Sequence, residues 1–289
     1  KSEHASNVLP WFELSHEINI KIKYIELDQD HKVTIENVKK AVTPNTKVIS
    51  LAHISNVVGD IRPIKEITKY AHQNHILVLC DGAQSVPHMK TDVEDLDVDF
   101  LTFSAHKMCG PTGVGVIYMK EEYLNDVRPI IFGGGMNAEF DNEGHVIYKN
   151  MPDLLEAGTP NIAGVIGFGY IIKYLEKIGF DNIHEYELSL KKYLIQRLKE
   201  IKEIEIYNEH SESGIVTINY QGIFPQDLSI YLDKYNICTR AGNHCAKILK
   251  DELKIKNTCR ISLYFYNTKE EIDALIEALK NPHIKEDII

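Results

Sequence analysis

The fold prediction rests on one stretch, Asp99-Phe100-Leu101-Thr102-Phe103-Ser104-Ala105-His106-Lys107. Its apolar residues indicate a short buried strand, and Gly110-Pro111-Thr112-Gly113 follows as a turn. A lysine directly after a buried strand lies where α/β sheets place their active sites. Loss of solvation there lowers the pKa of a lysine and frees its amine to attack a carbonyl carbon. The alternative is an ordinary solvated lysine at a strand end.

A second predicted strand ends in a carboxylate, in the stretch Ile76-Leu77-Val78-Leu79-Cys80-Asp81-Gly82-Ala83-Gln84. Its apolar run is typical of a strand in a parallel sheet. A carboxylate and a lysine at the ends of two buried strands suit pyridoxal 5'-phosphate (PLP). The lysine would form the Schiff base, and the carboxylate would keep the pyridine nitrogen protonated. The alternative for Asp81 is a helix N-cap or a strand-end turn.

These two stretches resemble the PLP-binding core of class V aminotransferase-fold enzymes. Within that class the chain resembles the cysteine desulfurases of the SUF type, group II. Six further motifs fit and follow the family's order from the first residues to the final helix. They are Glu3-His4-Ala5-Ser6-Asn7, Ser55-Asn56-Val57-Val58-Gly59, Glu156-Ala157-Gly158-Thr159-Pro160-Asn161, Arg240-Ala241-Gly242-Asn243-His244-Cys245-Ala246, Cys259-Arg260-Ile261-Ser262 and Tyr266-Asn267-Thr268.

The resemblance implies an α/β protein with the PLP-dependent transferase fold of type I. We expect a large, mostly parallel-sheet PLP-binding domain over residues 1–165 and a smaller α+β domain over 166–289 that carries the catalytic cysteine loop. Residues 133–161 are rich in Gly, Asn and Pro and predict an irregular connection. Sequence patterns predict strands over 20–27, 47–53, 114–119, 215–220, 237–240 and 258–263, and helices over 34–42, 63–74, 162–177, 181–202 and 226–235, with a final helix capped by Thr268 and Glu271.

The chain opens at Lys1 directly on a motif that the family places well inside its large domain. We therefore expect an N-terminally truncated chain that lacks the Gly/Thr-rich turn which helps to hold the PLP phosphate. An inactive fragment without part of the phosphate site is accordingly one alternative reading of the chain.

The resemblance assigns the residues around the cofactor ring. Lys107 would be the Schiff-base lysine and later the general base at the substrate α-carbon. Asp81 would pair with the pyridinium, and Gln84 would bind the phenolic oxygen. His4 would stack on the ring face, although the family's second histidine is Ala5 in this chain.

The resemblance also assigns residues to the cofactor phosphate. Ser104 and His106 flank the lysine and would donate hydrogen bonds to the phosphate. An ordinary turn histidine is the alternative for His106. Thr159 corresponds to a residue that reaches the partner's phosphate across a dimer interface, so the resemblance implies a homodimer.

Three residues are candidates for the substrate pocket. Arg260 could hold the carboxylate of an amino acid in a planar, two-bond clamp. Its alternative is an internal salt bridge. Arg240 is a second candidate for the same pocket, and Asn56 is expected near the substrate amino group.

Cys245 is the residue that would decide the reaction. It lies in a polar turn before a predicted helix, and a helix N-terminus favours the thiolate form of a cysteine. A thiolate there could accept the sulfur of L-cysteine as a persulfide. Three other cysteines adjoin apolar residues and are predicted to lie in the core, whereas Cys109 has no assigned role. The core candidates are Cys80, Cys238 and Cys259.

Composition limits the partners and the compartment. The chain has 289 residues and a formal net charge of −10, which argues against nucleic acid as the main partner. Its longest nearly apolar run, residues 162–175, is too short and too rich in Gly for a membrane span. Five cysteines without a C-x-x-C pair fit a cytoplasmic protein with no disulfide framework and no metal site.

The predicted function is a PLP-dependent cysteine desulfurase. It would convert L-cysteine to L-alanine, hold the sulfur as an enzyme persulfide and pass it to a sulfur-acceptor protein of the SUF system for iron–sulfur cluster assembly. A selenocysteine lyase, another class V PLP lyase or an aminotransferase remains an alternative within enzymes. A non-catalytic relic or scaffold is an alternative of a different class.

Overall fold

The computed structural model describes residues 1–287. Its strands are β1 Val48–Ala52, β2 Leu77–Asp81, β3 Phe100–Ser104, β4 Gly115–Met119, β5 Asn137–Phe140, β6 Val146–Tyr148, β7 Ile204–Ile206, β8 Ile215–Tyr220, β9 Arg240–Gly242 and β10 Thr258–Ser262. Its α-helices are α1 Leu9–Glu17, α2 Ile35–Ala41, α3 Ile64–Gln73, α4 Val93–Leu96, α5 Ile162–Ile178, α6 Phe180–Leu198, α7 Pro225–Asp233, α8 Lys247–Glu252, α9 Lys269–Leu279 and α10 Ile284–Asp287. Short 3₁₀ helices cover Ala5–Asn7, Ala105–Met108, Glu121–Tyr123 and Asp153–Leu155.

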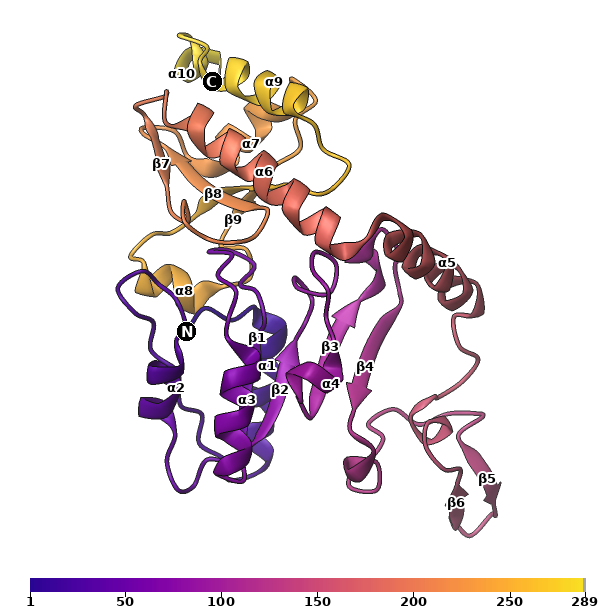
Figure 1. The fold of residues 1–289 in the computed structure, drawn as a ribbon. Helices are drawn as coiled ribbons and strands as arrows, with labels where there is room; N and C mark the ends of the chain where they lie inside the picture. The colour runs from indigo at the N-terminus through magenta and orange to yellow at the C-terminus, as the bar shows by residue number, and fades with distance from the viewer. Residues whose placement is uncertain (288–289) are drawn as a thin grey trace.

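The strands form two four-stranded sheets and one two-stranded sheet. The first sheet has the order β1-β2-β3-β4, the second has β7-β8-β10-β9, and β5 pairs with β6. Figure 1 shows the two larger sheets in separate halves of the molecule, with α5 at the outer side beyond β4 and α6 running from the end of α5 to the half that holds the second sheet.

The first sheet is parallel across β1, β2 and β3, whereas β4 runs antiparallel at the edge. This arrangement confirms the predicted mostly parallel α/β sheet. The buried face of β1, β2 and β3 packs against α3, whose apolar residues Ile64, Ile67 and Ala71 are spaced for one helix face. Because parallel strands end at the same edge, Asp81 at the end of β2 and the residues after β3 lie on one side of the sheet.

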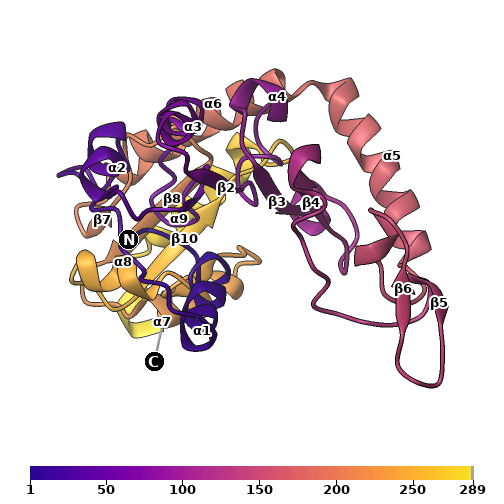
Figure 2. The same cartoon turned by 90° about the horizontal axis from the view of Figure 1, so that it is seen from below.

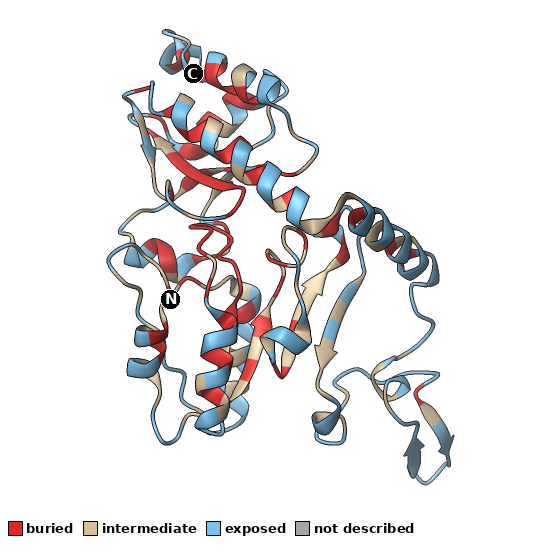
Figure 3. Cartoon of the chain, viewed as in Figure 1, coloured by how far each residue is buried: buried red, intermediate tan, exposed pale blue. Residues whose placement is uncertain are grey.

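The second sheet is antiparallel and packs against helices α6, α7 and α9. Its central strand β8 is buried along most of its length, as the red strand in the upper half of Figure 3 shows. The predicted caps are present on both sides of the molecule. Thr34 accepts a hydrogen bond from the backbone of Asn37 at the start of α2, and Thr268 and Glu271 form the predicted capping box of α9.

A third apolar cluster joins the two halves. It packs Ala105 and Met108, just after β3, against Phe168 and Leu175 of α5 and against Tyr264. Helix α5 spans the predicted domain boundary between 165 and 166, and that boundary stays a prediction. Within residues 1–287, each helix is either too short or too polar to cross a bilayer.

Four local predictions were wrong. Cys238 is exposed and does not lie in the core, whereas Cys80 and Cys259 are buried as predicted. Residues 20–27 form no strand, although Ile25 and Leu27 pack against the apolar core of the first sheet. The carbonyl of Ile25 accepts a hydrogen bond from the amino group of Lys1 at 3.2 Å, and this single bond to a distant segment is no strand pairing. The segment predicted as irregular contains the β5–β6 hairpin, which projects from the molecule beside α5 in Figure 2. The strand predicted over 237–240 begins only at Arg240, where pairing with β10 starts.

Candidate active site

A cavity of about 540 Å³ lies at the sheet edge where β2 and β3 end. Most of the residues predicted to bind cofactor or substrate line it, although they come from distant parts of the sequence. These are His4, Asn56, Asp81, Gln84, Ser104, His106, Lys107 and Arg240. The fold therefore brings together the groups that sequence motifs could only propose one by one.

Lys107 lies in the 3₁₀ turn Ala105–Met108 that directly follows β3. Burial is the main cause that lowers the pKa of its ammonium group, and the nearby cations Arg260 and Arg240 act in the same direction. The carboxylate of Asp81 opposes them. The neutral amine is the nucleophilic form, so this environment favours attack on a carbonyl carbon.

Asp81 ends β2 and faces the same cavity. Burial raises the pKa of its carboxyl group, while the backbone N–H of Ala83, which donates to Oδ1 at 2.9 Å, lowers it. A poorly solvated carboxylate binds a cation strongly, because little hydration is lost when the pair forms. This chemistry suits a protonated ring nitrogen.

His4 is held at the cavity by its own turn. The backbone N–H of Ser6 donates to His4 Nδ1 at 3.1 Å, which leaves the ring hydrogen on Nε2. Burial, followed by the charge of Lys107, lowers the pKa of the imidazole. The ring is therefore neutral, as a residue that stacks on a flat aromatic cofactor can be.

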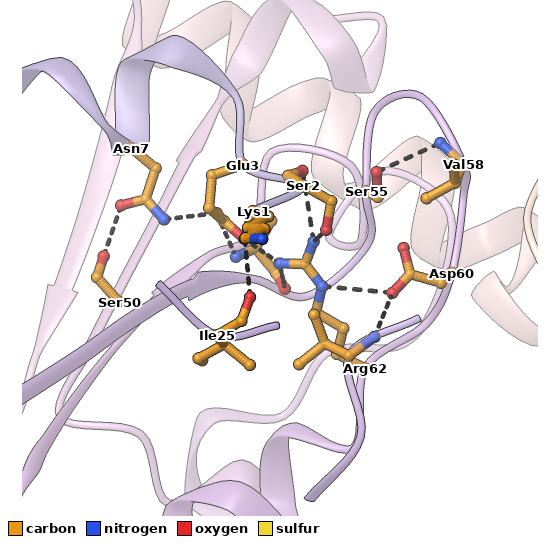
Figure 4. A network of polar contacts seen from close by, with 12 residues as sticks. Lys1, Ser2, Glu3, Asn7, Ile25, Ser50, Ser55, Val58, Asp60 and Arg62 are labelled. Atoms are coloured by element: carbon orange, nitrogen blue, oxygen red, sulfur yellow. Dashed lines mark hydrogen bonds and ion pairs between the residues drawn. The ribbon is translucent and has the colours of Figure 1, made fainter. Parts of the chain in front are cut away.

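The segment that carries His4 is fixed by a buried network that the sequence did not reveal (Figure 4). Glu3 pairs with the fully buried Arg62, and its Oε2 accepts hydrogen bonds from the backbone N–H of Ala52 at 2.9 Å and from Asn7 Nδ2 at 2.7 Å. Arg62 also pairs with Asp60. The only sequence signal was the position of Glu3 beside His4, because the arginine that holds it lies far along the chain.

Cys245 lies in the loop between β9 and α8 and is half-buried. Its Sγ is 3.7 Å from Nη2 of Arg240, a residue that lines the cavity. The carbonyl of Cys245 accepts a hydrogen bond from the backbone N–H of Ala5 at 2.7 Å, and Asn56 Nδ2 donates to the carbonyl of His244 at 2.8 Å. The thiol thus borders the site that Lys107 and His4 form.

Arg260 lies on β10 directly opposite Arg240 on β9. Its Nη1 donates to the carbonyl of Asn56 at 3.0 Å, while its buried Nε has no hydrogen-bond partner among the described residues. Burial, with Arg240 as the second cause, lowers the pKa of Arg260 to about 10. Since residues 1–287 supply no carboxylate to this guanidinium, the alternative of an internal salt bridge is not found. Two adjacent arginines beside the cavity are suited to an anionic substrate.

Three predicted site residues are not among those that line the cavity: Cys245, Arg260 and Thr159. Cys245 and Arg260 contact the lining residues Arg240 and Asn56. Thr159 is exposed in the loop before α5 and does not line the cavity, so its role stays a prediction.

Asp141, Glu143 and His145 converge at the exposed turn of the β5–β6 hairpin, where His145 bonds to Asp141. These contacts stabilise the turn, and the predicted absence of a metal site stays a prediction.

The family model for class-V aminotransferases matches residues 1–275. The chain belongs to the class-V aminotransferase family. A probable cysteine desulfurase of Halalkalibacterium halodurans is 43% identical over 278 residues, which cover 96% of this chain and 68% of that relative. A probable cysteine desulfurase of Staphylococcus aureus is likewise 43% identical, over 280 residues with the same coverage.

Solved structures of the family superpose closely on this fold. The cysteine desulfurase CsdA of Escherichia coli has a TM-score of 0.94 at 32% sequence identity, covering 100% of this chain and 71% of that one. The apo cysteine desulfurase of Thermococcus onnurineus NA1 has a TM-score of 0.92 at 34% identity, covering 98% of this chain and 71% of that one.

Enzymes of this family depend on PLP, and the cavity fits that cofactor. It offers an amine of lowered pKa, a buried carboxylate on a neighbouring strand and a neutral imidazole. It also offers the hydroxyl of Ser104 and the imidazole of His106 beside the lysine, where a phosphate can be bound. These residues supply what a flat, anionic aldehyde with a basic ring nitrogen needs.

Proposed function

We propose that the protein is a PLP-dependent cysteine desulfurase that converts L-cysteine to L-alanine and holds the sulfur as a persulfide on Cys245. The observation that carries this proposal is the contact between Cys245 Sγ and Arg240. It places a half-buried thiol next to a residue that lines the same cavity as Lys107. A thiol in this place can reach a substrate sulfur whose carboxylate is bound by the two arginines.

The residues divide the reaction among them. Arg260 and Arg240 bind the carboxylate of L-cysteine, and Asn56 lies beside its amino group. PLP, when bound, withdraws electrons from the carbon attached to the substrate nitrogen. Lys107 would hold the cofactor through its amine and would later take the proton from the substrate α-carbon. Asp81 would keep the ring nitrogen protonated.

Cys245 then completes sulfur transfer. Its thiolate attacks the sulfur of the substrate, a new S–S bond forms, and the bond between that sulfur and the β-carbon breaks. The electron pair of the broken bond remains with the β-carbon, which takes up a proton and leaves as part of L-alanine. One L-cysteine and one thiol thus give one L-alanine and one persulfide.

The proposal includes a homodimer. Large apolar side chains are exposed on α5 and on the segment after β4, where Figure 3 shows pale blue along the helix. They are Ile130, Ile131, Phe132, Ile162, Val165, Ile166 and Tyr170. A second copy of the chain would cover such a surface, and Thr159 lies in the loop beside it, where it could reach the partner's cofactor phosphate.

The proposal also places the enzyme in the cytoplasm, where it would give its sulfur to an acceptor protein of the SUF system for iron–sulfur cluster assembly. Five free cysteines, three of them at least partly exposed, support a reducing compartment. The loop Arg240-Ala241-Gly242-Asn243-His244-Cys245-Ala246 supports the SUF type through its resemblance to that group.

The test compares L-alanine and sulfide production by the PLP-loaded wild type and Cys245→Ser, with a thiol reductant present. Serine is a much poorer nucleophile near neutral pH, so the variant should bind PLP and lose turnover by a factor on the order of 10² or more. Cys238→Ser, which removes an exposed thiol outside the cavity lining, is the control and should keep its activity. Undiminished turnover in Cys245→Ser would instead support a lyase that needs no protein thiol, such as a selenocysteine lyase.

A further inference from the structure

Three buried polar side chains lie beneath the Cys245 loop and have no part in the reaction described above. His244 precedes the cysteine, Lys250 lies on α8, and Thr258 begins β10. Their exposed fractions are 2%, 1% and 0%, so all three are shielded from water. Removing three polar side chains from water costs free energy, so their position beside a reactive thiol indicates a function.

The three side chains form one chain of hydrogen bonds. Lys250 Nζ donates to Thr258 Oγ1 at 2.6 Å, and Thr258 Oγ1 lies 2.9 Å from His244 Nε2. A hydroxyl oxygen can accept two hydrogen bonds and donate one, so Thr258 Oγ1 can bond to the lysine and to the imidazole together. His244 Nδ1 is buried without a hydrogen-bond partner among the described residues, so the ring is held through Nε2. Burial, with the charge of Lys250 as the second cause, lowers the pKa of His244 to about 3, in agreement with a neutral ring.

The loop that these residues support has an unfavourable backbone. His244 and Cys245 both have φ near +55°, the left-handed region that residues with a Cβ rarely adopt. A residue in this region is strained and persists only where the surroundings fix it. The large domain fixes the backbone, through Ala5 and Asn56, whereas the small domain fixes the imidazole through Thr258.

Burying the ammonium group of Lys250 costs free energy that a purely structural position would not require. Burial lowers its pKa to about 8, and it forms no ion pair with any of the residues that the structure describes. An apolar residue of the same length would fill the space without that penalty. Thr258 and Arg260 are two residues apart on β10, so their side chains share one face of the strand and the network adjoins the substrate clamp.

We propose that Lys250, Thr258 and His244 are positioning residues that hold the Cys245 thiol toward the cavity. This inference rests on the proposed function, since it concerns the thiol that accepts sulfur. Loss of the network would release the imidazole and let the loop leave its left-handed conformation, which moves the sulfur away from the substrate. Misplacement by about 1 Å can lower a reaction rate on the order of 100-fold.

The test uses the PLP-loaded protein and the variants Thr258→Val, Thr258→Ser and Lys250→Met. We expect Thr258→Val and Lys250→Met to lower kcat for L-alanine release about 10- to 100-fold. The KM for L-cysteine should stay within about twofold, since the arginine clamp is intact. Thr258→Ser retains the hydroxyl and should restore activity. The rate of Cys245 alkylation by iodoacetamide, followed by peptide mapping, should change in Thr258→Val and remain normal in Thr258→Ser.

Lys191→Met is the matched control. Lys191 is also a buried lysine with a pKa lowered by burial to about 8, but it donates to the carbonyls of Asn208 and Ser211. The Lys191→Met variant should be less stable than the wild type and should keep the wild-type kcat. The inference is wrong if Thr258→Val and Lys250→Met lose no more kcat than Lys191→Met, or if Thr258→Ser is as slow as Thr258→Val. If Thr258→Val does not fold, Lys250→Met alone decides. A wild type that releases no L-alanine would instead contradict the proposed function.

Discussion

The two sides of the active site are built in different ways. Lys107 and Asp81 lie at the ends of neighbouring strands, so the parallel sheet alone brings them to one edge. Cys245 lies in a short loop with a left-handed backbone, and contacts from Ala5, Asn56 and Arg240 hold it there. The first side depends on regular secondary structure, whereas the second depends on contacts between segments far apart in the sequence.

This difference predicts where each side is vulnerable. On the lysine side, activity should depend on the reacting residues themselves, because the sheet maintains their position. On the cysteine side, activity should also respond to residues that never touch the substrate.

Replacing Lys107 by Arg should cause the largest loss. The guanidinium keeps the charge but cannot supply a neutral amine or act as a general base, so L-alanine release should fall by about 10²–10⁴ or more. Secondary structure by circular dichroism should be unchanged. Lys120→Arg is the control, because Lys120 only pairs with Asp97 and Asp99 away from the cavity. A Lys107→Arg variant within tenfold of wild type would contradict its assignment.

Replacing Arg62 by Met should affect stability more than any surface charge does. The change leaves the carboxylates of Glu3 and Asp60 without their buried partner, at a cost of about 3–5 kcal/mol in the free energy of unfolding. Chemical denaturation measures that loss. Lys65→Met removes the exposed pair with Asp95 and should cost about 0–1 kcal/mol. Equal losses would show that the network under His4 does not stabilise the fold.

Replacing Arg260 by Lys should weaken substrate binding. A lysine cannot make the two parallel hydrogen bonds to a carboxylate, and a lost charged hydrogen bond is worth about 1.5–3 kcal/mol. The KM for L-cysteine should therefore rise about 10- to 100-fold, with a smaller change in kcat. Arg197→Lys, at the surface pair with Asp273, should leave the KM unchanged. An unchanged KM in Arg260→Lys would remove it from the substrate clamp.

Acid should destabilise the fold through buried histidines. Burial lowers the pKa of His53 to about 4, below the ordinary 6.5, so the unfolded chain binds a proton that the folded chain does not. Stability is therefore complete above pH 6.5 and falls as the pH drops toward 4, by at most about 1.4 kcal/mol per pH unit. Urea unfolding at pH 7.5 and 5.5 should show a smaller acid loss in His53→Gln than in wild type. An equal loss would contradict the neutral state of this histidine.

Sequence patterns predicted the lysine side better than the cysteine side. The strands before Asp81 and Lys107 followed from local apolar runs, and the caps of α2 and α9 followed from residues three apart. The bond between Arg62 and Glu3, and that between Lys250 and Thr258, depend on tertiary folding and leave no periodic trace. The β5–β6 hairpin was missed for a related reason, because its exposed strands lack a buried face.

The central claim is that Cys245 receives the sulfur of L-cysteine. Its most direct test is to treat the PLP-loaded protein with one equivalent of L-cysteine, trap the thiols with an alkylating agent and map the peptides by mass spectrometry. We predict that the peptide containing Cys245 gains the mass of one sulfur atom in proportion to the L-alanine released. Formation of L-alanine with the added sulfur on Cys109 or Cys238, or on no cysteine at all, would contradict the claim.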